Sequence, residues 1–145
     1  MRLYGPVDVR NIKNGARLGR DFDVYIGRAA YGFPESPWHN PFRVGTGEGD
    51  VATRELAVGC YCVFLSKSPE LVERIRAELV GKSLGCWCKP LACHGDVIAR
   101  VAYGADPLSL VPPEAGSLES IERTVEAVLE LRKTTGGRLN RRGRA

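Results

Sequence analysis

The chain has 145 residues, 43% apolar and 26% charged, which is typical of one globular domain of ordinary size. No apolar run approaches the ~20 residues that span a bilayer, and the first residues do not resemble a secretory signal, so we expect a cytoplasmic protein with no membrane partner. The last eight residues hold four arginines and no acid, and they supply the whole net charge of +4. A basic surface for nucleic acid would therefore lie on the tail, residues 136–145, although short cationic tails are usually only solvated chain ends.

The first half of the chain is predicted to hold two short strands and a long loop. Residues 2–10 and 22–27 have strand-like patterns, and in the second Phe22, Val24 and Ile26 alternate with other residues and so predict one shared face. Asn14-Gly15 marks a turn between the strands. Residues 28–50 are rich in Gly, Pro, Ser and Asn, and loops of that length inside a domain are usually functional.

Helical and strand patterns alternate in the next stretch. We expect three helices and one strand, with Ser68 as the N-cap of the second helix; the helices cover residues 51–66, 69–80 and 94–103, and the strand covers 83–88. Together with the early strands this order predicts an α/β domain over residues 1–103, built on a small mixed sheet with helices on both faces.

The end of the chain is predicted to be a linker followed by one more helix. Residues 104–116 contain three prolines and read as the linker, and Ser117 caps a helix over 117–135 that Gly136-Gly137 ends. The apolar stripe of this helix must be buried on the domain or on a second copy in a homodimer, and we favour the domain; it consists of Leu118, Ile121, Val125, Val128 and Leu129.

A cluster of sulfur and imidazole groups occupies residues 86–96. Cys86 and Cys88 point to the same side of the predicted strand, and Cys93-His94 begin the following helix, whose N-terminal amides stabilise a thiolate. Cys88 and Cys93 are therefore predicted to have lowered pKa values. In α/β sheets the crevice beyond the carboxyl ends of the strands binds ligands, and we expect the cluster to lie there.

Three interpretations of this cluster are open. It could be a zinc site made of Cys86, Cys88, Cys93 and His94, although its C-x-C-x4-C-H spacing is not that of common zinc fingers. It could be a reactive site with a thiolate nucleophile and with His94 or Asp96 as the acid/base. Cys86 could also simply fill the core. Cys60 and Cys62, two apart on a predicted helix, face different directions and are expected to be packing residues.

A second set of polar residues follows the strand 22–27. Arg28 lies just past the strand end and is predicted to reach the same crevice, where a guanidinium favours phosphate or carboxylate groups. Asn40, before Pro41, could read an amide or a base edge, whereas Trp38 and Phe42 are expected to pack under the loop. Gly45-Thr46-Gly47 lacks the lysine and the spacing of a Walker loop.

These residues resemble a family of small, uncharacterised phage and bacterial domains. The pattern consists of Tyr25 to Arg28, the loop segment 38–42, the helical Arg54, and the segment Gly81 to Asp96 that includes Cys86-Trp87-Cys88-Lys89-Pro90. His39 departs from the family, which more often has glycine there. The last segment is also similar to a second uncharacterised family with a C-x-E-x-x-P-x-x-C-H-R signature. The resemblance implies a Rossmann-like α/β domain and brings no established reaction.

The preferred hypothesis is an enzyme that acts on a nucleotide or a modified nucleobase. Its pocket is predicted to place a thiolate (Cys88 or Cys93) and a proton carrier (His94 or Asp96) beside the ligand-binding residues Arg28, Asn40, Arg54 and Lys89. The alternative is a non-enzymatic, zinc-stabilised module that binds a host protein or nucleic acid. An oligomeric adaptor built on the last helix is a third hypothesis.

Overall fold

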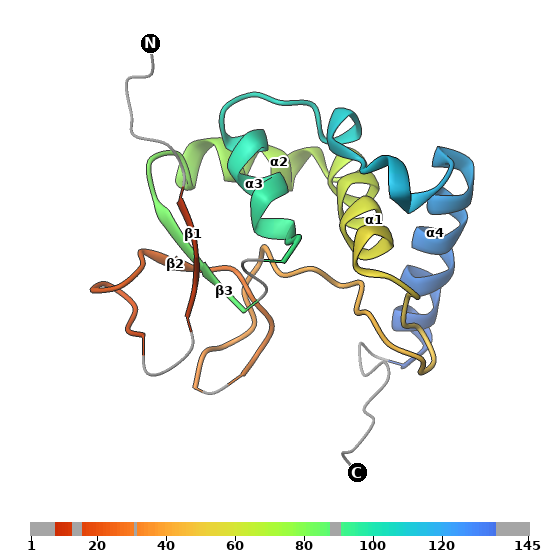
Figure 1. Cartoon of the computed structure of the whole chain (residues 1–145), viewed down its shortest axis with the longest axis horizontal. Helices are drawn as coiled ribbons and strands as arrows, with labels where there is room; N and C mark the ends of the chain where they lie inside the picture. Colours follow the sequence, from red (N-terminus) through yellow and green to blue (C-terminus); the bar gives the residue numbers. More distant parts are fainter. Residues whose placement is uncertain (1–7, 13–15, 31, 88–90, 136–145) are drawn as a thin grey trace.

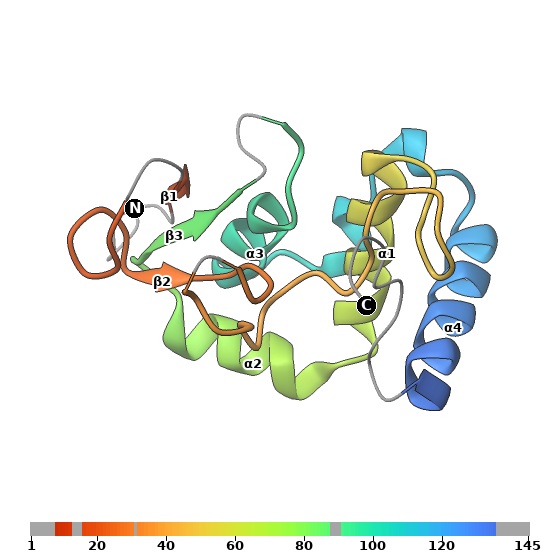
Figure 2. The ribbon, with the colours of Figure 1, turned by 90° about the horizontal axis from the view of Figure 1, so that it is seen from below.

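A computed structural model of the chain describes residues 8–12, 16–30, 32–87 and 91–135. The described residues form three strands and four α-helices: β1 (Asp8–Asn11), β2 (Val24–Tyr25), β3 (Ser83–Cys86), α1 (Arg54–Ser66), α2 (Pro69–Glu78), α3 (His94–Ala102) and α4 (Leu118–Thr135). The sheet lies at one end of the molecule and the α1/α4 pair at the other, with α3 between them (Figures 1 and 2). The fold class, α/β, agrees with the prediction.

The sheet is parallel throughout and has the order β1-β3-β2. Both β1 and β2 pair with β3 in parallel register, with Val9 and Val24 each opposite Leu84. The expectation of a mixed sheet is therefore wrong for the described strands. The buried run Leu84-Gly85-Cys86 is typical of an interior parallel strand, because both of its faces are covered.

Helices cover one face of this sheet, and loop residues cover the other. Val9, Val24 and Leu84 pack in one core cluster with apolar residues of α1, α2 and α3. On the opposite face, a Cβ on Gly85 would contact Phe22 and Ile12, so loop side chains fill the space that a helix would need. The prediction of helices on both faces is thus wrong for the described residues. Phe22 also does not share the face of Val24 and Ile26, because β2 begins only at Val24.

Side chains at the helix starts explain where the helices begin. Thr53 caps α1 by accepting a hydrogen bond from the Leu56 N–H at 3.0 Å, so this helix begins three residues later than predicted. Ser117 accepts from the Ser120 N–H at 3.1 Å, as expected for the start of α4. Ser68 precedes α2, but its hydroxyl donates to the Phe64 carbonyl at 2.9 Å and does not cap the helix.

The segment 104–116, predicted to be a linker, is part of the packed structure. It contains two short 3₁₀ helices, η1 (Pro107–Leu110) and η2 (Pro113–Ala115). Ala115 is buried against α1, where a Cβ on Gly59 would lie only 2.8 Å from the Ala115 Cβ. Glycine at position 59 therefore allows this segment to approach α1 closely.

The apolar face of α4 is buried within the chain. Ile121, Val125 and Val128 pack in a second core cluster with Cys60 and Val63 of α1, which is the alternative that the sequence favoured over a second copy. Cys62 belongs to the other cluster, so the two cysteines of α1 face different parts of the core, as predicted. The predicted turn at Asn14-Gly15 and the tail at 136–145 lie outside the described residues. In the described ranges, no helix combines the length and apolar character needed to cross a bilayer.

Candidate functional site

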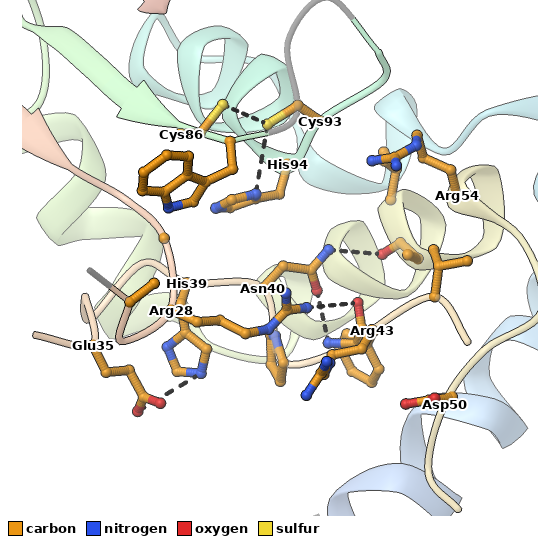
Figure 3. Close-up of a pocket in the computed structure, with 18 of the residues that line it drawn as sticks. Arg28, Glu35, His39, Asn40, Arg43, Asp50, Arg54, Cys86, Cys93 and His94 are labelled. Atoms are coloured by element: carbon orange, nitrogen blue, oxygen red, sulfur yellow. Dashed lines mark hydrogen bonds and ion pairs between the residues drawn. The ribbon is translucent and has the colours of Figure 1, made fainter. Parts of the chain in front are cut away.

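A cavity of about 740 Å³ lies at the carboxyl edge of the sheet. Because all three strands are parallel, the segments that follow β2 and β3 leave the sheet at this same edge. Figure 3 shows Cys86, Cys93 and His94 on one side of the cavity and Arg28, Arg43 and His39 on the other, with Arg54 on the side of Cys93. The polar side chains on its walls are Arg28, Glu35, His39, Asn40, Arg43, Asp50, Arg54, Trp87, Cys86, Cys93, His94 and Arg132.

Cys93 is the N-cap residue of α3, and its sulfur accepts hydrogen bonds there. Its extended backbone aims Sγ at the first turn of the helix, where the Gly95 N–H donates to it at 3.3 Å. The Cys86 Sγ lies 3.2 Å from the Cys93 Sγ. The partial positive charge at a helix N-terminus stabilises negative charge on a group that caps it.

His94 is held in one orientation by a backbone carbonyl. Its Nε2 lies 2.8 Å from the Ile26 oxygen, and because that oxygen can only accept, Nε2 carries the proton. In the neutral ring Nδ1 is then an acceptor, and it lies 3.7 Å from the Cys93 Sγ. The Tyr61 ring packs edge-on against the imidazole, with the ring centroids 5.1 Å apart. The unprotonated Nδ1 of His94 thus faces the Cys93 sulfur.

Gly95 allows the start of α3 to sit directly on the sheet. A Cβ at this position would lie 2.8 Å from the Val9 Cγ1 and 2.9 Å from the Ile26 Cδ1, so a side chain would push the helix away. The same close approach brings His94 within reach of the Ile26 carbonyl. A glycine therefore sets the geometry of the Cys93–His94 pair.

The arginines reach the cavity from four separate segments. Arg28 follows β2 and donates to the Phe42 carbonyl at 3.2 Å. Arg54, the first residue of α1, donates to the Ala92 carbonyl at 3.5 Å. Arg43 lies in the loop, and Arg132 lies in the last turn of α4. Since only Glu35 and Asp50 bring carboxylates among the described lining residues, the walls carry excess positive charge.

Asn40 ties the loop to α1. Its side-chain nitrogen donates to the Ala57 carbonyl at 3.2 Å, and its oxygen accepts from the Phe42 N–H at 2.9 Å. Asn40 therefore positions the loop, although it also lines the cavity as predicted. Trp38 and Phe42 are buried in the core beneath the loop, also as predicted.

His39 is a partly buried imidazole among charged groups. Its Nδ1 donates to the Ser36 carbonyl at 2.8 Å, which leaves Nε2 as an acceptor without a hydrogen bond among the described residues. Burial, followed by the charges of Arg132 and Arg28, lowers the pKa of His39, so the ring is neutral at pH 7. Its 3.8 Å contact with Glu35 is consequently not an ion pair at that pH.

Trp87 and Tyr25 support the wall that follows β3. The Trp87 indole N–H donates to the Tyr25 hydroxyl at 2.9 Å, and that hydroxyl donates to the Arg28 carbonyl. A Cβ on Gly27 would lie 2.5 Å from the Tyr25 oxygen, so glycine is needed where the chain passes this hydroxyl. These contacts fix the backbone from which Arg28 projects.

The structure brings together most of the predicted site residues. Arg28, Asn40, Arg54, Cys93 and His94 all line the cavity, with Cys86 beside them. Asp96 lies in the first turn of α3 and is not among the lining residues. Cys88 and Lys89 lie outside the described residues. Of the four proposed zinc ligands, three can thus be placed, and the described part of the chain holds no group of three or more side chains suited to a metal ion.

Sequence reasoning did not select five of the charged or basic lining residues: Glu35, His39, Arg43, Asp50 and Arg132. Arg43 directly follows the Asn40-Pro41-Phe42 segment, so its place next to a candidate ligand-binding residue could have identified it as a lining residue. Arg132 has no local signal, because only the packing of α4 on α1 brings it to the cavity.

The chain was compared with known proteins and structures. No solved structure matches it, so the Rossmann-like arrangement stays a prediction. It is 37% identical over 84 residues, 56% of this chain and 68% of the relative, to an "Uncharacterized 12.4 kDa protein in nrdA-td intergenic region" of Enterobacteria phage T4. Residues 9–104, which include every cavity-lining residue except Arg132, match a family described as "Domain of unknown function (DUF4326)". The chain therefore belongs to the DUF4326 family.

Proposed function

We propose that the protein is a cysteine-dependent enzyme that acts on a nucleotide or a modified nucleobase, with Cys93 as the nucleophile. One observation carries this proposal: the Cys93 sulfur lies at a helix N-terminus, 3.7 Å from an oriented imidazole nitrogen, in the wall of an arginine-lined cavity. A nucleophile, its base and a third group that orients the base are the parts that nucleophilic catalysis requires.

The proton of the Cys93 thiol would pass to His94. It moves from Sγ to Nδ1, and the resulting imidazolium keeps its Nε2–H on the Ile26 carbonyl. The thiolate keeps the hydrogen bond from the Gly95 N–H. The Sγ–Nδ1 distance is at the long end for a hydrogen bond, and such contacts commonly tighten when substrate binds.

The chemical step in this proposal is addition of the thiolate to an electrophilic carbon of the base. The sulfur lone pair forms a C–S bond, and the displaced electron pair moves to a ring nitrogen or to a leaving group. That atom receives the proton that His94 holds on Nδ1. The arginines that line the cavity would bind the substrate and take no part in the bond changes.

The size, charge and lining of the cavity support a nucleotide as substrate. Its volume of about 740 Å³ lies within the range of small-molecule sites. Guanidinium groups bind phosphate oxygens through paired N–H donors, and Arg28, Arg43 and Arg54 supply them from different sides. Trp87 adds an aromatic ring at the sulfur end, where a nucleobase could pack.

Alkylation of the full chain tests the nucleophile. Iodoacetamide at pH 7 is expected to modify Cys93 faster than a free thiol of the same peptide, and fragment-ion mapping separates Cys93 from Cys86 and Cys88. Cys60 and Cys62 are internal controls, since burial raises the pKa of each to about 12. A Cys93 that reacts no faster than the free peptide, in a chain whose melting temperature no nucleotide shifts, would contradict the proposal.

A second proposal, the zinc-stabilised module that binds a host protein or nucleic acid, has one observation in its favour. Cys86, Cys93 and His94, three of its four ligands, lie close together. Elemental analysis of the purified protein separates the two proposals. One zinc per chain, whose removal unfolds the protein, supports the module, whereas a folded, metal-free chain with a reactive Cys93 supports the enzyme.

A further inference from the structure

The last turn of α4 brings a charged residue to the cavity from outside the family domain. Ile121, Val125 and Val128 fix α4 on α1, and Arg132 then lines the cavity wall. The family match ends at residue 104, so Arg132 is added by the segment that follows it. The extra helix therefore changes the composition of a site that is otherwise built by the family domain.

Arg132 joins two other arginines at the end of the cavity away from the sulfurs. Arg28 lies there beside His39, and Arg43 lies beyond Arg28, both across the cavity from Cys86 and Cys93 (Figure 3). Burial lowers the pKa of His39 most, and the positive charges of Arg132 and Arg28 lower it further, so both guanidinium groups lie near enough to this imidazole to affect its charge. Three cations thus converge on one end of the cavity.

Two of these cations lack an acidic partner in the part of the chain that the structure describes. Arg43 and Arg132 form no ion pair there, whereas Arg20, Arg74 and Arg123 each pair with a carboxylate on the surface. Asp50 also lines the cavity, and its carboxylate accepts from the Gly47 N–H at 3.1 Å. Glu35, which lies 3.8 Å from the His39 Nε2, and Asp50 are the carboxylates among the described lining residues. The three arginines outnumber them, and a bound anion lowers the repulsion between the arginines.

We propose that Arg28, Arg43 and Arg132 form an oligophosphate subsite, in which Arg132 selects ligands with two or more linked phosphates over monophosphates. The proposal rests on the proposed function and narrows its substrate class to nucleoside diphosphates and triphosphates. Arg28 and Arg43 come from the family domain and provide donors for a first phosphate. Arg132 provides the donors that a longer phosphate chain requires.

Titration of the full chain with inorganic phosphate, pyrophosphate and tripolyphosphate at constant ionic strength tests this subsite. Isothermal titration calorimetry is expected to show affinity rising with the number of phosphates. Arg132→Gln is expected to weaken tripolyphosphate about tenfold and to change inorganic phosphate less than twofold, since only the longer anion reaches residue 132. Lys133→Gln is the matched control, because it removes the same charge from the exposed neighbouring residue.

Three results would overturn the proposal. Equal losses in Arg132→Gln and Lys133→Gln would mean that only overall charge matters, provided that both variants melt like the parent chain. Equal weakening of all three anions by Arg132→Gln would remove the selectivity. A short oligothymidylate that binds through Arg132 more tightly than tripolyphosphate would assign the arginines to a nucleic-acid backbone.

A Cys93→Ser variant separates this proposal from the proposed function. It lacks the nucleophile but keeps the arginines, so it is expected to discriminate among the three anions as the parent chain does. Retained discrimination together with an unreactive Cys93 in the parent chain would leave the subsite standing and refute the enzyme. If Cys93 is reactive but the chain does not discriminate among the three anions, the enzyme proposal stands and the oligophosphate subsite is refuted.

Discussion

Two pairs of buried cysteines, Cys60 with Cys62 and Cys86 with Cys93, have similar exposure and different surroundings. The first pair lies in the middle of α1 among apolar side chains, and burial raises the pKa of both thiols to about 12. The second pair lies at the sheet edge, where Cys93 caps α3 and faces His94. We therefore expect the two pairs to differ in reactivity despite equal burial, because a helix N-terminus and an imidazole lie beside the second pair.

The largest expected effect follows from removing the base beside Cys93. His94→Gln places an amide nitrogen where Nε2 donates to the Ile26 carbonyl, but it removes the Nδ1 acceptor. The alkylation rate of Cys93 at pH 7 is expected to fall about 100-fold, within the range for loss of a general base. A time course read by mass spectrometry measures it. If the variant melts like the parent chain and the alkylation rate is unchanged, His94 is not the cause of any difference in reactivity between the two cysteine pairs.

A substitution at Gly95 tests whether the helix position creates the difference. Gly95→Ala brings a Cβ within 3 Å of the Val9 and Ile26 side chains and is expected to lower the free energy of unfolding by roughly 1–3 kcal/mol, measured by urea denaturation. The rate of Cys93 alkylation should fall as well, because the helix start moves away from the sheet. Adding Val9→Ala should restore part of the free energy of unfolding and part of the alkylation rate. A double variant with the same stability and the same rate as Gly95→Ala would contradict this account.

The pair in the core, Cys60 and Cys62, should make the folded chain less stable in alkaline solution. An unfolded thiol titrates near pH 8.5, whereas the pKa of Cys60 and Cys62 in the folded chain is about 12. Their contribution to stability is therefore complete below about pH 8.5 and is lost as the pH rises toward 12. At pH 10 the free energy of unfolding should be lower than at pH 8 by roughly 2 kcal/mol per thiol.

Urea denaturation at pH 8, 9 and 10 measures that loss. A Cys60→Ala/Cys62→Ala variant is expected to have a flatter pH dependence than the parent chain, while Cys86→Ala keeps the contribution of the core pair. The same slope in the double variant and in the parent would show that other groups cause the loss.

The smallest expected effect concerns the contact between the two sulfurs at the sheet edge. Cys86 lies 3.2 Å from the Cys93 Sγ and can donate an S–H to a thiolate there. Cys86→Ala should slow the alkylation of Cys93 about two- to threefold, whereas Cys86→Ser keeps a donor and should stay near the parent rate. Equal rates in the two variants would reduce Cys86 to a packing residue.

Local signals in the sequence predicted which residues line the cavity better than they predicted the layers of the fold. Cys93-His94 at a helix start and Arg28 at a strand end could be placed because each depends on one element boundary. The cover on the sheet face opposite the helices could not be predicted, because Phe22 and Phe33 come from loops and pack there only once the strands have paired. Arg132 could not either, because its position depends on how two helices far apart in the chain dock.

The strand order β1-β3-β2 has a consequence for synthesis on the ribosome. The central strand is the last of the three to be made, so residues 8–11 and 24–25 have no partner until residues 83–86 emerge. Contacts between such distant parts of a chain slow folding. A nascent chain that stops before residue 83 is therefore expected to lack the sheet entirely, together with the edge on which the Cys93–His94 pair is assembled.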